Sequence, residues 1–262
     1  MQLRGRNALI TGSTQGIGAA FAEALAAEGC NVMLNGLGNP NDIETFRTAL
    51  VSKHNVKVTY SRANVANVSE IEELMSDAQK AMGSIDILIN NAVTRHIASI
   101  EEFGVDKWEY ALAVNLSAAF HTIRLALPGM RERNWGRIIN MTSMLSSRAL
   151  PNKVDYVVTK HALLGLTRTV AVETATTRIT CNSISPGWVL TPHSETQIAQ
   201  QIRSTGQSRA DAITELSKVR QPSLRIISAE KIASLAVYLC SEAASEITGA
   251  ALPVDGGWSA GN

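Results

Sequence analysis

Short apolar runs and longer amphipathic segments alternate along most of this chain. Apolar runs of strand length lie at 7–10, 31–35, 56–60, 85–89, 137–141, 179–185 and 250–254. Segments with helical periodicity separate them, at 19–28, 42–54, 69–82, 105–133 and in the stretch after residue 153. This alternation predicts an α/β fold, a doubly wound parallel sheet (Rossmann fold) with helices on both faces. No linker, repeat or low-complexity tract interrupts it, so we expect a single domain over residues 1–262.

The alternation stops between Pro186 and Arg225. Residues 186–192 are rich in turn formers, and polar helical stretches follow at 195–204 and 209–218. An insertion after the carboxyl end of a strand lies where doubly wound sheets bind ligands. We therefore interpret residues 187–225 as a helical lid over a substrate, with a surface helical hairpin as the alternative.

Composition excludes several classes of function. The net charge is +1, with 45% hydrophobic and 18% charged residues, and no basic block indicates a nucleic-acid partner. Cys30, Cys181 and Cys240 have neither metal-site nor disulfide-framework spacing, so we expect no metal and a reduced compartment. No signal peptide precedes the first strand, and no run reaches the roughly 18 apolar residues of a membrane span. These features predict a cytoplasmic protein without a membrane partner.

A glycine-rich turn follows the first predicted strand. It reads Thr11-Gly12-x-x-x-Gly16-Ile17-Gly18 and leads into an alanine-rich helix and a second strand. Strand, glycine turn, helix and strand form the mononucleotide-binding unit, in which glycines let the backbone approach a pyrophosphate at the helix N-terminus. The sequence therefore predicts a dinucleotide site.

A hydroxyl, a phenol and an ammonium group are expected to meet at the end of the strand at 137–141. Ser143 follows this strand, and Tyr156 and Lys160 lie four residues apart, on one face of a helix. The ammonium group favours the phenolate, and the serine hydroxyl can hydrogen-bond the reacting oxygen. Such a trio can move a proton to or from an alcohol.

These motifs resemble the short-chain dehydrogenase/reductase family over essentially the full length. The matching residues, in order, are the glycine turn, Asn90-Asn91-Ala92, Asn115, Ser143, Tyr156-x-x-x-Lys160 and Pro186-Gly187. The resemblance implies that Tyr156 is the general acid/base, that Ser143 orients the substrate oxygen and that Lys160 binds the nicotinamide ribose. It implies a water-holding role for Asn115. Val93 departs from the family's usual glycine after Asn-Asn-Ala, which predicts a small change in the backbone beside the cofactor.

The resemblance also implies a set of cofactor contacts. They are Gly12, Thr14, Gln15, Gly16, Ile17, Gly18, Asn35, Gly36, Asn64, Val65, Asn91, Ala92, Tyr156, Lys160, Pro186, Gly187, Val189 and Thr191. The second strand ends in Asn35-Gly36-Leu37, with no acidic residue for a ribose hydroxyl and no basic residue for a 2′-phosphate. Because nothing would neutralise a 2′-phosphate, we favour NAD over NADP.

Within the family, the chain resembles the D-3-hydroxybutyrate dehydrogenases. Lys153 and Gln197 match polar residues that hold the small carboxylate in those enzymes, and Trp188 matches a pocket wall. Arg95 and Leu145 replace a glutamine and a histidine. Arg95 with Lys153 would still form an anion site, because a guanidinium grips a carboxylate or sulfonate through two hydrogen bonds. Alternatively, Arg95 and Arg148 are solvated surface charges.

We therefore expect an NAD-dependent oxidoreductase that interconverts a small anionic secondary alcohol, a hydroxy acid or an acidic sugar, and its ketone. The alternatives are an NADPH-linked ketoreductase similar to 3-oxoacyl carrier-protein reductases, a dehydrogenase of neutral sugars or alcohols, and a catalytically silent dinucleotide sensor. Family members are usually tetramers, so the resemblance implies a homotetramer.

Overall fold

The computed structural model describes residues 1–261, in which seven parallel strands form one sheet in the order β3-β2-β1-β4-β5-β6-β7. The predicted doubly wound parallel sheet is confirmed. The strands are β1 (Asn7–Ile10), β2 (Asn31–Asn35), β3 (Val58–Ser61), β4 (Ile87–Asn90), β5 (Gly136–Met141), β6 (Ile179–Pro186) and β7 (Ala251–Val254).

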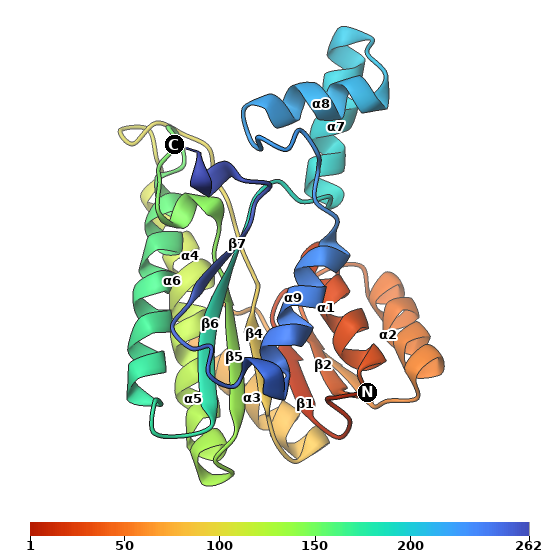
Figure 1. The fold of residues 1–262 in the computed structure, drawn as a ribbon, viewed down its shortest axis with the longest axis vertical. Coiled ribbons are helices and arrows are strands. Elements are labelled where there is room, and N and C mark those ends of the chain that lie inside the picture. Colours follow the sequence, from red (N-terminus) through yellow and green to blue (C-terminus); the bar gives the residue numbers. More distant parts are fainter. Residues whose placement is uncertain (262) are drawn as a thin grey trace.

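Helices cover both faces of this sheet, as Figure 1 shows. One face carries α1 (Gly16–Ala27), α2 (Pro40–His54) and α9 (Ala229–Cys240). The other carries α3 (Val68–Met82), α4 (Val105–Leu112), α5 (Ala118–Glu132) and α6 (Val154–Glu173). Every residue of β1, β4, β5 and β6 is buried, because strands covered on both faces have no solvent side.

Helix α9 was not predicted. Its sequence contains Ile232, Ala233, Ala236 and Leu239, all buried against the sheet and α1. The apolar face has ordinary helical spacing, but no strand separates it from the predicted lid, so the alternation gave no signal there. Elsewhere the predicted elements are present, and their ends shift by a few residues, as for α1, which begins at Gly16.

The segment Val105–Glu132 is one continuous helical stretch. It is the one helix in residues 1–261 that is long and apolar enough, by length and composition, to cross a membrane, although polar residues interrupt it. In the structure it packs against β4, β5 and α3, and 44% of its most apolar stretch is buried. This stretch therefore packs on one face of the sheet along part of its surface.

The order of the strands reverses between β1 and β4. These two strands pair with each other, but the loops that follow them lead to opposite faces of the sheet. This is the crevice in which open α/β sheets bind ligands. Helices α7 (Pro192–Thr205) and α8 (Arg209–Lys218) rise beyond the carboxyl ends of the strands, apart from the layered body (Figure 1). They form a small apolar cluster of their own around Trp188, Ile198 and Ala212.

Candidate active site

The glycine turn between β1 and α1 leaves no room for a Cβ at Gly12 or Gly18. Gly12 has φ +63°, and a Cβ there would lie 2.8 Å from the Cα of Ala92. A Cβ on Gly18 would lie 2.1 Å from the carbonyl oxygen of Gly12. No side chain caps α1, and its first turn has no acidic residue, so its first amides are free to receive an anion.

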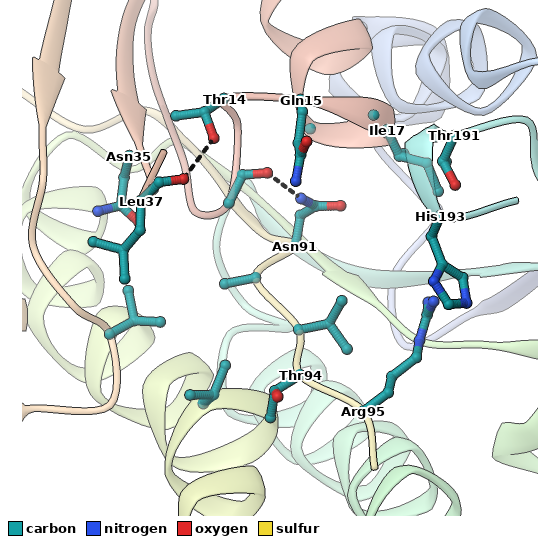
Figure 2. Close-up of a pocket in the computed structure, with 18 of the residues that line it drawn as sticks. Thr14, Gln15, Ile17, Asn35, Leu37, Asn91, Thr94, Arg95, Thr191 and His193 are labelled. Atoms are coloured by element: carbon teal, nitrogen blue, oxygen red, sulfur yellow. Dashed lines mark hydrogen bonds between the residues drawn. The ribbon is translucent and has the colours of Figure 1, made fainter. Parts of the chain in front are cut away.

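A long groove runs from this turn across the crevice. Figure 2 shows Asn35 and Leu37 toward one end and Arg95 with His193 toward the other. Thirteen of the predicted cofactor residues line it: Gly12, Thr14, Gln15, Gly16, Ile17, Gly18, Asn35, Gly36, Asn64, Val65, Asn91, Ala92 and Thr191. A second hollow shares Ile17, Asn91, Arg95, Thr191 and His193 with this groove and adds the remaining five, Tyr156, Lys160, Pro186, Gly187 and Val189. The structure thus brings every predicted cofactor contact to one continuous depression.

The loop after β4 is tied to the glycine turn. The Asn91 carboxamide donates to the carbonyl oxygens of Thr11 and Gly12 at 3.1 and 2.8 Å. The Thr11 hydroxyl accepts from the backbone amides of Asn91 and Ala92 at 3.0 and 3.1 Å. Val93 follows without positive φ and is 40% exposed, lining the groove, so its side chain imposes no backbone strain.

Tyr156 and Lys160 share one face near the start of α6. The Lys160 Nζ lies 5.5 Å from the centre of the Tyr156 ring and donates to the carbonyl oxygen of Met141 at 2.5 Å. Lys160 is buried. This hydrogen bond ties the ammonium group to the end of β5, beside the phenol, as the spacing predicted.

Asp155 fixes a second loop to the same helix. One carboxylate oxygen accepts from the Tyr156 amide at 2.6 Å, and the other accepts from the His96 amide at 3.1 Å. The carboxylate is fully buried. It therefore holds the loop carrying Arg95 against α6, and the Arg95 Cζ lies 5.0 Å from the centre of the Tyr156 ring.

The charges around Tyr156 favour its ionised form. Burial raises the pKa of this phenol, but Arg95, Lys160 and hydrogen bonding from Ser143 and Arg95 lower it, and the net shift is downward. Burial lowers the pKa of Lys160 to about 8. The charge of Tyr156 opposes this shift, and the charge of Arg95 reinforces it. A phenol with a lowered pKa is suited to act as a base near neutral pH.

Ser143 has two roles in the local structure. Its hydroxyl accepts from the Leu145 amide at 3.1 Å and caps the 3₁₀ turn Met144–Ser146, while hydrogen bonding also links it to Tyr156. This cap uses the hydroxyl as an acceptor and is therefore compatible with the substrate-orienting role that the family resemblance implies for Ser143.

Asn115 lies in a π-helical turn, Ala113–Ser117, between α4 and α5. Its carboxamide oxygen accepts from the Thr94 amide at 2.8 Å, and its nitrogen donates to the Thr94 carbonyl at 3.0 Å. Asn115 and Lys160 line the same small internal cavity. The side chain therefore ties this turn to the loop before Arg95, and its carboxamide oxygen keeps a second lone pair.

The structure places some of the predicted substrate residues at the hollow beside Tyr156 and others away from it. Trp188 lines the hollow beside Tyr156, and Gln197 accepts from the Trp188 indole at 3.3 Å. Leu145 is buried beneath the site. Arg148 lies with its Cζ 5.4 Å from the Trp258 ring centre and does not line the hollow, so of the two arginines considered only Arg95 reaches it.

Two basic side chains near the site, His193 and Arg220, were not singled out from the sequence. His193, in the first turn of α7, lines the groove, and its imidazole is 3.3 Å from the amide nitrogen of Gln197. Arg220, just after α8, lies with its Cζ 5.2 Å from the Trp188 ring centre. Arg220 immediately precedes Gln221, whose carboxamide oxygen accepts from the Trp188 amide at 2.8 Å. The position of Arg220 next to Gln221, within the predicted lid, is the feature of the sequence that could have identified it.

Comparisons with known proteins agree with this geometry. A family profile described as enoyl-(acyl carrier protein) reductase matches residues 12–259. The D-beta-hydroxybutyrate dehydrogenase of Cupriavidus necator is 43% identical over 98% of each chain. The enzyme of that name from Rhizobium meliloti is 44% identical over 97% of this chain and 99% of its own. L-sorbose reductase from Gluconobacter frateurii, solved with NADPH and L-sorbose, superposes with a TM-score of 0.92 at 32% identity, over 98% of each chain.

Proposed function

This chain belongs to the short-chain dehydrogenase/reductase family, and we propose that it is an NAD-dependent dehydrogenase of a small anionic secondary alcohol. The observation that carries the proposal is the grouping of Tyr156, Lys160 and Arg95 at one end of a dinucleotide-shaped groove. The relatives named for hydroxybutyrate support a hydroxy acid as the substrate.

The groove fits a dinucleotide. The free amides of α1 and the Cβ-excluding glycines form a pyrophosphate cradle, and the buried Asn35 Oδ1 has no partner among the described residues. Around the end of β2, Asn35, Gly36 and Leu37 line the groove without charge, which supports NAD rather than its 2′-phosphate. Bound nicotinamide would accept the hydride from the alcohol carbon.

Tyr156 removes the hydroxyl proton in this mechanism. Its phenolate, stabilised by Lys160 and Arg95, accepts the proton, and Ser143 donates a hydrogen bond to the same substrate oxygen. The developing ketone oxygen thus lies between two hydrogen-bonding groups. Trp188 closes the hollow on the lid side and excludes water from the reacting atoms.

The test is NADH formation from D-3-hydroxybutyrate, other hydroxy acids, acidic sugars and neutral secondary alcohols, each with NAD and with NADP. We expect turnover of anionic alcohols with NAD, and its loss in Tyr156→Phe. A preference for NADP and neutral alcohols would instead support the ketoreductase or neutral-sugar alternative. No turnover of any alcohol, with dinucleotide binding retained, would support the silent sensor.

We also propose a homotetramer in a reduced, cytoplasmic compartment. Exposed apolar side chains on α4, α5 and α6, including Tyr110, Phe120 and Val172, support burial in an assembly. All three cysteines are buried and free, which supports a reducing environment. Light scattering coupled to size exclusion tests the assembly, and a monomeric mass would refute it.

A further inference from the structure

Three cationic side chains from separate parts of the chain lie near the substrate hollow: Arg95 lines it, Arg220 contacts its wall residue Trp188, and Lys153 precedes Tyr156 by three positions. Arg95 lies in the loop after β4, Lys153 is the N-cap residue of α6, and Arg220 follows α8. Burial, Arg95 and, to a smaller extent, Arg220 hold the pKa of Lys153 below its usual range, against the opposing charge of Tyr156. Burial, Arg95 and Lys153 lower the pKa of His193 as well. These mutual effects indicate a cluster of like charges.

None of the three has an anionic partner within residues 1–261. No ion pair in this part of the chain includes Arg95, Lys153 or Arg220, and no Asp or Glu lines either part of the depression. The adjacent carboxylate, Asp155, is committed to two backbone amides. A cluster of unpaired cations in a partly buried site is costly unless a ligand supplies the counter-charge.

Contacts hold two of these cations in place. The Arg220 Nη1 donates to the Leu216 carbonyl at 2.6 Å, and its guanidinium lies 5.2 Å from the ring centre of Trp188, a buried residue. The Arg95 guanidinium lies beside the Tyr156 ring. Arg95 therefore faces the hollow directly, whereas Arg220 lies against the wall formed by Trp188 and acts on a ligand there through its charge.

We propose that the substrate is a dianionic secondary alcohol, with two negative charges that Arg95, Lys153 and Arg220 neutralise together. This inference rests on the proposed dehydrogenase function and extends it to a substrate class. A monoanion such as 3-hydroxybutyrate would leave at least two of the three cations unpaired, whereas two carboxylates or one fully ionised phosphonate would leave one. Guanidinium groups suit both anions, because each oxygen pair can accept two parallel hydrogen bonds.

The first experiment compares alcohols built on one skeleton and differing in charge. 3-Hydroxyglutarate and fully ionised 3-hydroxybutylphosphonate are the dianions, 3-hydroxybutyrate and its sulfonate analogue the monoanions, and 3-hydroxybutanamide the neutral compound. Because a hydrogen bond to a charged group contributes more than a neutral one, we expect kcat/KM of at least one dianion to exceed that of 3-hydroxybutyrate about tenfold or more. Equal or lower values for both dianions would overturn the proposal, and the favoured compound distinguishes a dicarboxylate from a phosphonate.

Variants test whether the named cations cause this preference. Arg220→Gln should reduce the ratio of dianion to monoanion kcat/KM about tenfold. Arg220→Lys, which keeps the charge, should retain most of the ratio. The matched control is Arg148→Gln, because Arg148 lies against Trp258, whereas Arg220 lies against Trp188, which lines the hollow. An Arg220→Gln variant with the wild-type ratio would overturn the assignment.

A binding measurement separates failure of this inference from failure of the proposed function. Glutarate and butyrate differ by one carboxylate and cannot be oxidised at a hydroxyl. We expect glutarate to raise the melting temperature of the NAD-loaded protein more than butyrate at equal concentration and ionic strength. Equal shifts would overturn the dianion site even if hydroxybutyrate is oxidised. Absence of any alcohol oxidation, with a larger glutarate shift, would overturn the dehydrogenase function alone.

Discussion

Arg95 provides the sharpest test of the electrostatics around Tyr156. We expect Arg95→Gln to raise the pKa of the Tyr156 phenol in the free enzyme, because the substitution removes a cation whose Cζ lies 5.0 Å from the ring centre. Lys160 remains and still favours the phenolate. The acid limb of the pH profile for alcohol oxidation should therefore move to higher pH.

The distance gives the size of the effect. Two unit charges about 5 Å apart interact by about 1 kcal/mol in water and by about 3 kcal/mol at the intermediate dielectric near a protein surface. Arg95 is exposed, so the lower figure applies. On the acid side of the profile, kcat/KM follows the phenolate fraction, and about 1 kcal/mol corresponds to about a fivefold loss.

The assay must separate this effect from the binding of the substrate's anion. A neutral secondary alcohol serves that purpose, because it has no charge for Arg95 to bind. NADH formation is followed across pH for wild type, Arg95→Gln and the charge-conserving Arg95→Lys. We expect the loss with Arg95→Gln to be confined to low pH, and Arg95→Lys to restore most of the activity there.

Two results would refute this reasoning. The first is an unmoved acid limb in Arg95→Gln, which would mean that solvent already screens the guanidinium from the phenol. The second is an equal loss at every pH, which would mean that Arg95 positions the substrate or the loop and has no effect on the ionisation of Tyr156.

Further predictions concern the proton acceptor, the cofactor turn, the buried lysine and the thiols. Tyr156→Phe should lower kcat/KM about 10²- to 10⁴-fold with an unchanged melting temperature, and near-normal turnover would exclude this phenol as the base. Gly18→Ala should abolish NAD binding in a titration of cofactor fluorescence, because the new Cβ would overlap the Gly12 carbonyl; wild-type affinity would count against the cradle. Burial lowers the pKa of Lys160 to about 8 from its ordinary 10.5. Between these two pH values the unfolded chain binds a proton that the native protein has lost. The contribution of Lys160 to the free energy of unfolding therefore rises with pH. Melting temperatures of the cofactor-free protein and Lys160→Met should therefore differ less toward alkaline pH, and a constant difference would contradict the shift. Burial raises the pKa of all three cysteine thiols, that of Cys240 to about 12, so Ellman's reagent should label none until the protein unfolds.

Local spacing explains which parts of the site were predictable. The glycine turn and the Tyr156–Lys160 pair depend on residues a few positions apart, and regular helix geometry then fixes their relation. The strands could be predicted because burial on both faces makes them continuously apolar. Helix α9 has a comparable apolar face but lies outside the strand–helix alternation, and it was overlooked for that reason.

Long-range contacts explain what the sequence could not provide. The π-helical turn at Asn115 accompanies two hydrogen bonds to Thr94, twenty-one positions earlier. The sequence left open whether Arg95 and Arg148 are surface charges, and the contact of Arg148 with Trp258, near the far end of the chain, could not be predicted from it. Arg220 comes close to the site only through its contact with Trp188, thirty-two positions earlier. No periodicity encodes such pairings.

The separation of α7 and α8 from the layered body has a consequence for protein engineering. The groups that move the proton come from β5 and α6, whereas Trp188, Gln197 and Arg220 belong to one excursion of the chain between β6 and α9. That excursion leaves and rejoins the body beside the Val189–Ile227 bridge, so both of its ends are close together. Residues 190–226 are therefore suited to exchange as a cassette between relatives, which would carry Gln197 and Arg220 with it while Arg95, Lys153, Trp188 and the proton-transfer groups stay in their native surroundings.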